Sequence, residues 1–525
     1  MFRQIIKLFG TAAVLLAATT ACGDLTVEPK SSITDASVFS DPASYRAFLA
    51  KLYAGLVVTG QNGPDNNPDI VGIDEGFGQY IRGYWQLQEL PTDEAIIAWG
   101  DAGLPEMNTQ TWSASNVFVN AMYSRIYYQI ALVNQFLRET TDEKLASRGV
   151  SAALKAQVQG YRAEARFLRA LSYWHAIDFF GNVPFTDENT NVASLPQQAT
   201  RTEVFTFIEN ELKAVRPLLL AKSSGDNYGR ASQAAVDMLL AHLYLNAKVY
   251  TGTDRSSDAR VAAEAAIAGG FTLDPSYTKL FSADNNTSPE MIFTVPQDGV
   301  HTRTWGGLTF IVHAGVGGSM NPANFGIDGG WYGLRIRSPV SDRYAAEPAG
   351  DQRASIMYTN GQTKVATSIS DFSKGYGFPK YRNVTSTGAT GSNLTFPDTD
   401  YPMFRLADAY LIYAEAVLRG GGGSLVTALN YVNLVRERAY GGPTGDITPA
   451  QLTLQFVLDE RGRELPWEAF RRQDLIRYGQ FSDAGIWEWK GNVAAGTVTA
   501  KFHDLYPIPS NELSANPNIK QNSGY

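Results

Sequence analysis

The chain has 525 residues with 9 Trp, 26 Tyr and 26 Phe, but only five His and a single Cys. One cysteine excludes an intramolecular disulfide, a CxxC redox pair and a cysteine-based zinc or iron–sulfur site. A formal charge of −8 argues against a nucleic-acid-binding protein, which would need a concentrated basic face. A chain of this length can bury a large core without disulfide support.

Residues 1–21 are typical of a secretory signal peptide. Arg3 and Lys7 form a basic start, and the apolar run over residues 12–18 is too short to span about 30 Å of hydrocarbon. The small residue before Cys22 resembles the cleavage site of a bacterial lipoprotein, at which this thiol would be acylated and become the new amino terminus. We therefore predict lipidation at Cys22, with an ordinary signal peptide and an incidental cysteine as the alternative.

Residues 22–40 are rich in Ser, Thr and Asp and predict an extended, lipidated tether. No further apolar run of about 18 residues follows it. Lipid alone is therefore expected to hold the protein to a membrane surface.

Amphipathic helices are predicted from residue 41 onward. Asp41 followed by Pro42 is typical of a helix start, and apolar residues then recur every three or four positions, on one face. The same spacing recurs over residues 167–177, where Gly181 is expected to close the helix, and over residues 236–250 and 406–417. It recurs again over 425–435, after a glycine turn at 420–423 and a cap at Ser424. Such pairs predict a mostly α fold of irregular tetratricopeptide-like helix pairs, each of which buries its face against the next.

Two long stretches, residues 61–112 and 271–400, are rich in Gly, Asn, Asp and aromatic residues and lack a helical period. They predict a loop-rich region with a few short strands, and loops of this length on a rigid scaffold usually carry function. We expect an N-terminal helical region over residues 41–270. A C-terminal region over residues 271–525 would follow, with its helices over 401–480.

No motif for metal or phosphate chemistry is present. The histidines form no HExxH motif and no i, i+4 pair, so each is expected at the core edge or the surface. They are His175, His242, His301, His313 and His503. Carboxylates and arginines alternate from Glu460 to Arg477 on one expected helix, where their spacing favours structural ion pairs that keep the carboxylates ionised.

Two acidic pairs, Asp74-Glu75 and Asp93-Glu94, lie in the aromatic stretch over residues 61–112. A glycosidase needs two carboxylates that flank the scissile bond. A hydrolase that uses Asp74 or Glu94 as acid and nucleophile is therefore one alternative. The same side chains also suit hydrogen bonds to sugar hydroxyls.

Four segments together resemble the SusD/RagB family of outer-membrane nutrient-uptake lipoproteins. They are AEARFLRALSYWHAIDFFGNVPF (163–185), YPMFRLADAYLIYAEAVLRGG (401–421), RGRELPWEAFRRQDLIRYGQF (461–481) and YPIPSNELSANPNIKQNSGY (506–525). The resemblance implies a mostly α-helical, non-catalytic protein that is lipid-anchored at the cell surface and captures glycans or peptides. It also implies a SusC-like TonB-dependent β-barrel transporter as partner, on which the protein would sit as a lid, with its helical-repeat surface toward the barrel.

Four further segments are similar to the starch-binding branch of this family. They are GIDEGFGQYIRG (72–83), LPTDEAIIAWGDAG (90–103), PQDGVHTRTWGGLTF (296–310) and DGGWYG (328–333). By this resemblance Trp305 and Trp331, with Trp99 beside them, would supply an arc of aromatic rings that follows an α-glucan. Asp74 and Arg82 would bind its hydroxyls.

The residues around the predicted aromatic arc change what we expect of its size and exposure. Ile97 and Ala102 stand where the family pattern has an aromatic residue and an asparagine, so the arc would have one ring and one amide fewer. Gly306-Gly307 and Gly329-Gly330 flank two of the tryptophans and predict exposed loop tips. Buried packing in irregular loops is the alternative role for all three tryptophans.

The predicted function is capture of an oligosaccharide at the outer membrane, with an α-glucan as the best match, and its delivery to a barrel transporter. A lid that captures peptides or other glycans, and a glycoside hydrolase, are the alternatives. No cofactor and no nucleic-acid partner are expected, and the residue pattern neither requires nor excludes a structural calcium ion.

Overall fold

The computed structural model describes residues 38–61, 63–64 and 68–525. The predicted signal peptide, Cys22 and all but the end of the predicted tether lie outside these residues. The described chain falls into two units, one that ends at Tyr45 and one that spans Arg46–Tyr525. Helix α3 (Ala43–Ala54) crosses this boundary, and Asp41 Oδ1 accepts a hydrogen bond from Ala43 N at 2.9 Å at its start.

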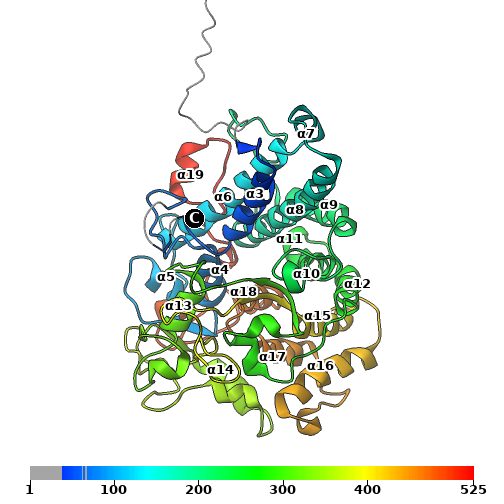
Figure 1. Cartoon of the computed structure of the whole chain (residues 1–525). Coiled ribbons are helices and arrows are strands. Elements are labelled where there is room, and N and C mark those ends of the chain that lie inside the picture. The colour runs from blue at the N-terminus through cyan, green and yellow to red at the C-terminus, as the bar shows by residue number, and fades with distance from the viewer. Residues whose placement is uncertain (1–37, 62, 65–67) are drawn as a thin grey trace, which may run out of the picture. The chain divides into compact units, whose positions relative to one another are not determined.

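Within Arg46–Tyr525 a row of helices stacks in chain order and confirms the predicted mostly α fold (Figure 1). α6 packs on α8, α8 on α9, α9 on α10, α10 on α12, α12 on α15 and α15 on α16. Their bounds are α6 Val117–Glu139, α8 Ala152–Phe180, α9 Arg201–Val215, α10 Gln233–Leu245, α12 Ser256–Ile267, α15 Leu406–Leu418 and α16 Leu425–Tyr440, with the short α7 (Asp142–Ser147) and α11 (Ala247–Thr251) between them. The loop-rich residues 271–400 therefore leave the stack after α12 and return to it at α15.

Local signals place the ends of these helices. Asn116 accepts a hydrogen bond from Phe118 N at 3.0 Å at the start of α6, and Ser424 accepts one from Thr427 N at 3.2 Å at the start of α16. Gly181 closes α8 with φ of +70°, a conformation that favours glycine. The cap at Ser424 and the glycine that ends α8 confirm two predictions made from the sequence.

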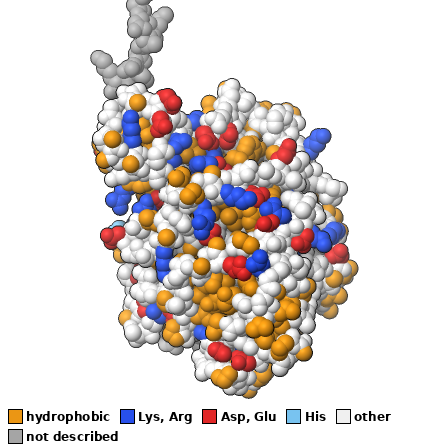
Figure 2. All heavy atoms as spheres, turned by 90° about the vertical axis from the view of Figure 1, so that its right-hand side faces the viewer, with side chains coloured by type: hydrophobic (Ala, Val, Ile, Leu, Met, Phe, Trp, Pro, Cys, Tyr) orange, Lys and Arg blue, Asp and Glu red, His pale blue; other side chains and the backbone are white. Residues whose placement is uncertain are grey.

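Figure 2 shows the face that lies to the right in Figure 1, on which hydrophobic side chains spread between scattered charges. On α12 and α16 the exposed apolar residues are Val261, Leu425 and Val426. Among the residues that the structure describes, no helix is both long and apolar enough to cross a membrane. The helical stack thus carries apolar side chains on its outer surface.

The loop-rich region contains more helix than the sequence predicts. Helices α4 (Tyr80–Glu89) and α5 (Leu104–Thr109) lie within residues 61–112, and α13 (Gly307–Ala314) and α14 (Ser338–Ala345) lie within residues 271–400. Short helices are therefore part of the loop-rich region, which the sequence predicts only as loops with a few short strands. Every residue of α4 is buried, although its polar residues Arg82, Gln86 and Glu89 recur at helical spacing, a local signal that the composition of the stretch obscures.

The described residues form three antiparallel strand pairs, of which two link distant segments. β1 (Ala95–Ile97) pairs with β5 (Leu334–Ile336), β2 (Val183–Pro184) with β3 (Gln198–Ala199), and β4 (Met291–Val295) with β6 (Tyr401–Arg405). The first and third pairs tie the loop-rich region to segments far away in the chain. They give this region a fixed frame on which side chains can be positioned.

The single helix predicted across residues 460–477 is two helices, α17 (Leu454–Glu464) and α18 (Arg471–Arg477); a last short helix, α19, spans Ser510–Ala515. Pro466 follows α17 and cannot continue it, because proline has no N–H to donate. Trp467 and Ala469 then both adopt φ of +64°. Trp85 Nε1 donates to Trp467 O at 2.9 Å, and Ala469 N donates to Glu89 Oε1 at 2.6 Å, so contacts from α4 hold the break.

The carboxylates of residues 460–477 form ion pairs, as predicted. These pairs belong to a buried network that also includes residues from other parts of the chain. Arg405 lies 2.8 Å from Glu290, 2.6 Å from Glu464 and 2.7 Å from Glu468, and Arg353 lies 2.9 Å from Glu464. Burial alone would raise the pKa of Glu464, but the surrounding arginines lower it to about 2. These groups are therefore ionised at neutral pH and hold the core together.

Asp400 is a buried carboxylate whose protonation should govern stability between about pH 4 and pH 7. Tyr228 OH donates to its Oδ2 at 2.6 Å and Gln297 N donates to its Oδ1 at 2.7 Å, while burial raises its pKa to about 7. The unfolded chain loses this proton near pH 4, so the stability contributed by Asp400 falls by about 4 kcal/mol as the pH rises to about 7. We expect Asp400→Asn to remove most of this slope in urea unfolding at about pH 4.5 and about pH 7.5.

Asp342→Asn is the matched control for this experiment. Asp342 is exposed and pairs with Lys364 at the surface, so its replacement should leave the wild-type slope unchanged. Equal pH slopes for the wild type and Asp400→Asn would contradict the assignment.

Candidate functional site

The pairing of two short strands brings Trp99 and Trp331 together. In the β1–β5 register Ile97 faces Leu334, Trp99 follows β1, and Trp331 precedes β5. Trp99 Nε1 donates to Trp331 O at 3.0 Å, and the two ring centroids lie 6.2 Å apart. A Cβ on Gly333 would lie 2.8 Å from the Trp99 ring, so glycine is needed where the strands leave this pair.

Trp331 is anchored on α13. Its N donates to His313 O at 2.8 Å, and the imidazole of His313 stacks on its indole with centroids 4.6 Å apart and planes inclined by 26°. His313 Nδ1 lies 2.6 Å from Gly329 O, and Nε2 lies 2.9 Å from Thr395 O. Both ring nitrogens of His313 therefore lie within hydrogen-bond distance of a backbone carbonyl oxygen, each from a different loop. His313 thus holds the Trp331 ring and two flanking loops in one arrangement.

Trp305 stands just before α13, at the turn that meets α4. Its ring centroid lies 6.4 Å from that of Trp331 and 5.0 Å from that of Phe396. A Cβ on the first residue of Gly306-Gly307 would lie 2.3 Å from Gln79 Cβ, so the backbone approaches α4 closely. Both glycines are buried, and the prediction of an exposed loop tip here is wrong.

Trp305 and Trp331 form one side of a hollow of about 440 Å³, hereafter the tryptophan hollow. Its other lining residues are Pro68, Ile73, Asp74, Glu75, Gly76 and Arg82. Asp74 is exposed, and its Oδ1 accepts a hydrogen bond from Phe77 N at 2.9 Å, so the turn before α4 sets its direction. Helix α4 supplies the arginine of the hollow.

Arg82 is a buried guanidinium at the wall of the hollow, only 4% exposed. It lies 4.7 Å from the ring of Phe77 and 4.3 Å from that of Phe310, and its Nε donates to Gln86 Oε1 at 3.0 Å. Burial lowers the pKa of Arg82 to about 10, so the group stays charged at neutral pH. Its Nη2 has no hydrogen-bond partner among the described residues, and an unpaired buried donor is costly. A ligand oxygen in the hollow would satisfy it.

The structure brings together four of the five residues predicted to bind a ligand. Asp74, Arg82, Trp305 and Trp331 line the tryptophan hollow, whereas Trp99 does not. The Trp99 ring packs against those of Trp331 and Phe310, the latter with centroids 5.6 Å apart. Trp99 therefore supports the hollow, and the roles of all five residues in binding remain predictions.

The acidic pair Asp93-Glu94 is closed to a ligand. Asp93 lies 2.6 Å from Arg343 and 2.7 Å from Arg471, Glu94 lies 2.8 Å from Arg343, and both carboxylates are buried. Burial alone would raise the pKa of Asp93, but Arg471 and Arg343 hold it well below its usual range. The hypothesis that Glu94 acts in hydrolysis or bonds a sugar hydroxyl is therefore wrong, because its carboxylate is buried against Arg343 inside the core.

Three histidines expected at the core edge or the surface lie in the core instead: His175, His242 and His313. Gly329-Gly330, expected at an exposed tip, are half-buried. Within the part of the chain that the structure describes, no group of three or more His, Cys, Asp or Glu residues is placed to hold a metal ion.

Sequence reasoning missed two side chains that support the tryptophans, His313 and Phe396. Phe396 is far from Trp305 in the chain, and His313 meets Trp331 only because the end of α13 pairs with the segment before β5. No local spacing signals either contact.

His313→Leu should weaken both the fold and ligand binding at the hollow. The change removes the imidazole contacts with two backbone carbonyl oxygens and the stack on Trp331, which should cost about 2 kcal/mol of unfolding free energy and lower affinity several-fold. Urea unfolding and calorimetric titration measure the two effects. His301→Leu, at an exposed histidine, should leave the unfolding midpoint unchanged, and an equal midpoint for His313→Leu would contradict the anchoring role.

Two family models match this chain. The model described as the SusD family matches residues 319–525, and the model described as starch-binding associating with outer membrane matches residues 81–245. The second match includes Arg82 and Trp99, and the first includes Trp331.

Known proteins match over nearly the whole length. Starch-binding protein SusD of Bacteroides thetaiotaomicron is 34% identical over 100% of this chain and 99% of its own. SusD-like protein P2 of Formosa agariphila is 25% identical over 98% of this chain and 99% of its own. The structure of surface glycan-binding protein A from Bacteroides fluxus is similar with a TM-score of 0.70 at 22% identity, covering 92% of this chain and 99% of that one. A structure from Bacteroides thetaiotaomicron, surface glycan-binding protein A in complex with laminarihexaose, has a TM-score of 0.69 at 21% identity, covering 91% and 98%. With this full-length identity and this fold, the chain belongs to the SusD family.

Proposed function

We propose that this protein binds a glycan through the tryptophan hollow and does not cleave it. The observation that carries the proposal is that two adjacent indoles, a buried unpaired donor and an exposed acceptor surround one hollow. A pyranose ring has apolar C–H faces, which pack on indole, and hydroxyls, which both donate and accept. Trp305 and Trp331 suit the faces, and Arg82 and Asp74 suit the hydroxyls.

The expected strength of the sugar–indole contacts is suitable for a protein that captures a glycan and then releases it. If one sugar covers roughly 60 Å² of indole, the transfer free energy is about 1.5 kcal/mol. Two such contacts, set against the costs of binding, suit dissociation constants of roughly 1 mM to 10 μM. A ligand held this weakly can be handed on.

An α-glucan is the ligand class we favour. The relative that is 34% identical over the whole chain is named a starch-binding protein, and the matching family model is described as starch-binding. The indoles of Trp305 and Trp331 are inclined by 42°, and those of Trp99 and Trp331 by 45°. Rings that turn in this way suit a ligand that curves, as an α-1,4-linked glucan does.

The proposed location is the outer face of the outer membrane, with a lipid on Cys22 as the anchor. The description of the matching family model as associating with the outer membrane supports this location. The proposed partner is a SusC-like TonB-dependent barrel that takes up the captured glycan. The apolar side chains on α12 and α16 suit a contact with such a partner.

Calorimetric titration against a panel tests the ligand class. Maltoheptaose should bind, while fructan, xylan and peptide probes should bind at least about tenfold more weakly. Laminarihexaose belongs in the panel because it is bound in one similar structure. Tight binding of peptides with no binding of any glycan would favour the peptide-capturing alternative.

A reducing-end assay tests the hydrolase alternative. Purified protein incubated with maltodextrin should release no new reducing ends. Among the described residues, the carboxylates that line the hollow are Asp74 and its chain neighbour Glu75, so Glu75 is the one candidate for a second catalytic carboxylate there. Release that Glu75→Gln abolishes would overturn the non-catalytic proposal.

A further inference from the structure

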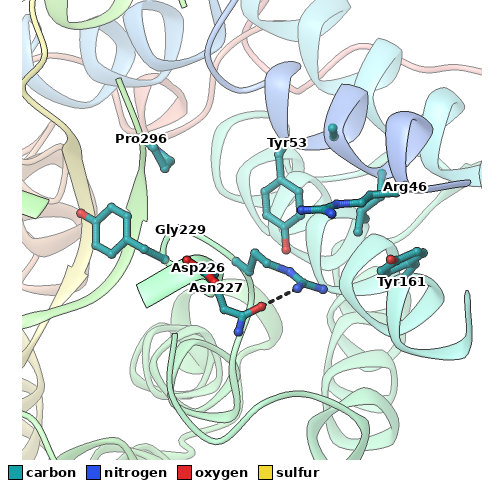
Figure 3. Close-up of a pocket in the computed structure, with 11 residues that line it drawn as sticks. Arg46, Tyr53, Tyr161, Asp226, Asn227, Gly229 and Pro296 are labelled. Atoms are coloured by element: carbon teal, nitrogen blue, oxygen red, sulfur yellow. Dashed lines mark hydrogen bonds between the residues drawn. The ribbon is translucent and has the colours of Figure 1, made fainter. Parts of the chain in front are cut away.

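A second recess, hereafter the tyrosine pocket, is larger than the tryptophan hollow and takes no part in the function proposed above. Its volume is about 560 Å³. Helix α3, helix α8, the loop at residues 226–230 and the end of β4 enclose it (Figure 3). The side chains that matter here are Arg46, Tyr53, Tyr161, Asp226, Tyr228 and Pro296.

The floor of the tyrosine pocket is fixed by a buried carboxylate, Glu164. Tyr53 OH donates to Glu164 Oε2 at 2.6 Å, and Arg230 Nε donates to the same oxygen at 3.1 Å. Ala231 N donates to Tyr53 OH at 2.8 Å, so the hydroxyl is fully used. The Tyr53 ring is therefore held in place before any ligand arrives.

The opposite wall is equally well fixed. Tyr228 OH donates to the buried Asp400 at 2.6 Å. Gly229 has φ of +76°, and a Cβ there would lie 2.3 Å from Pro296 Cγ, so the loop packs on Pro296 without a gap. The pocket is thus preformed on both sides, which lowers the cost of binding.

Polar groups at the mouth of the tyrosine pocket are free to meet a ligand. The side chains of Arg46, Tyr161 and Asp226 form no hydrogen bond or ion pair within the described residues. Figure 3 shows Arg46 and Tyr161 on one side of the pocket and Asp226 and Pro296 on the other. Arg46 and Arg230 balance Asp226 and Glu164 in charge, so the pocket suits a neutral ligand that donates and accepts hydrogen bonds beside aromatic rings.

The tyrosine pocket and the tryptophan hollow lie along the same two segments of the chain. Arg46–Tyr53 and Pro296 line the pocket, whereas residues 68–82 and Trp305 line the hollow. A smaller recess of about 220 Å³ has Lys51 and Ala54 on one side and His301 and Arg303 on the other. Along each of these two segments the order is therefore the same: first the tyrosine pocket, then the smaller recess, then the tryptophan hollow.

We propose that the tyrosine pocket is a second binding site for a neutral saccharide, and that it takes the far end of a long glycan chain whose other end lies in the tryptophan hollow. The proposal rests on the glycan-binding function proposed above. A chain too short to reach both recesses would use the hollow alone. A long chain would gain affinity from the second contact, since the two sites are linked through one ligand.

Titration with ligands of two lengths tests the second site. Maltotetraose and a long maltodextrin of narrow size range are titrated into the full mature protein, into Tyr161→Ala and into Trp305→Ala/Trp331→Ala. We expect Tyr161→Ala to weaken the long chain roughly tenfold, the effect of one lost aromatic contact, and to leave maltotetraose unchanged. Tyr161→Phe, which keeps the ring, should retain most of the affinity for the long chain.

The outcomes separate this proposal from the one on which it rests. Binding of maltotetraose with equal long-chain affinity for the wild type and Tyr161→Ala would overturn the second site and leave the tryptophan hollow intact. Binding of neither saccharide by the wild type would overturn both proposals. The unfolding midpoint of every variant is measured as well. Arg46→Ala changes an exposed residue at the mouth of the tyrosine pocket, so it is a second test variant that should fold like the wild type.

Discussion

Arg405→Met is expected to lower the free energy of unfolding by about 3 to 5 kcal/mol. Arg405 is buried and lies within 2.8 Å of each of three carboxylates, Glu290, Glu464 and Glu468. Methionine fills similar space but leaves these carboxylates without their shared cation inside the core. The measurement is the midpoint of urea unfolding, with the slope of the transition as a check that the unfolded state is unchanged.

Lys213→Met is the control for this prediction. Lys213 pairs with Glu209 on the surface of α9, with 55% of its side chain exposed, and such pairs contribute at most about 0.5 kcal/mol. A loss below about 1 kcal/mol for Arg405→Met would contradict the view that the ionic network holds this core.

Trp305→Ala/Trp331→Ala is expected to reduce glucan affinity roughly 100-fold. Each indole offers about 1.5 kcal/mol of sugar contact, and their rings lie 6.4 Å apart on one hollow, so one ligand meets both. Calorimetric titration with maltoheptaose measures the loss. Both rings are half-buried and Trp331 stacks on His313, so the unfolding midpoint should fall modestly, and titration is carried out well below it.

Trp489→Ala is the control, because it replaces one half-buried tryptophan outside the hollow by alanine. Trp489 Nε1 donates to Ala366 O at 2.6 Å, and the residue lines neither recess. It should bind maltoheptaose like the wild type. Equal losses of maltoheptaose affinity in Trp489→Ala and in the double variant would show that the losses come from general loosening of the loops. They would then not be evidence for binding in the tryptophan hollow.

Much of the helical fold could be predicted because its signals are local. The cap at Ser424, the glycine that ends α8 and the apolar spacing of α8 and α15 all lie within a few residues of the structure they set. The break between α17 and α18 had a local signal as well, Pro466, which a reading of charge spacing alone overlooks.

The frame of the hollow could not be predicted because distant segments build it. The motifs indicated that Trp99, Trp305 and Trp331 belong together, but the β1–β5 register decides that Trp99 lies against Trp331 and outside the hollow lining. Helix α4, which positions Arg82, is buried all round although its polar residues Arg82, Gln86 and Glu89 lie at helical spacing, so its place in the core could not be predicted from its own sequence. Asp93-Glu94 looked like a site pair only because their arginine partners, Arg343 and Arg471, come from much later in the chain.

A crystal structure of the protein with maltoheptaose bound tests the central claim most directly, since it locates the ligand. We predict glucose residues packed on the indoles of Trp305 and Trp331, with sugar oxygens within hydrogen-bond distance of Arg82 Nη2 and the Asp74 carboxylate. Sugar bound elsewhere on the protein, with the tryptophan hollow empty, would contradict the account.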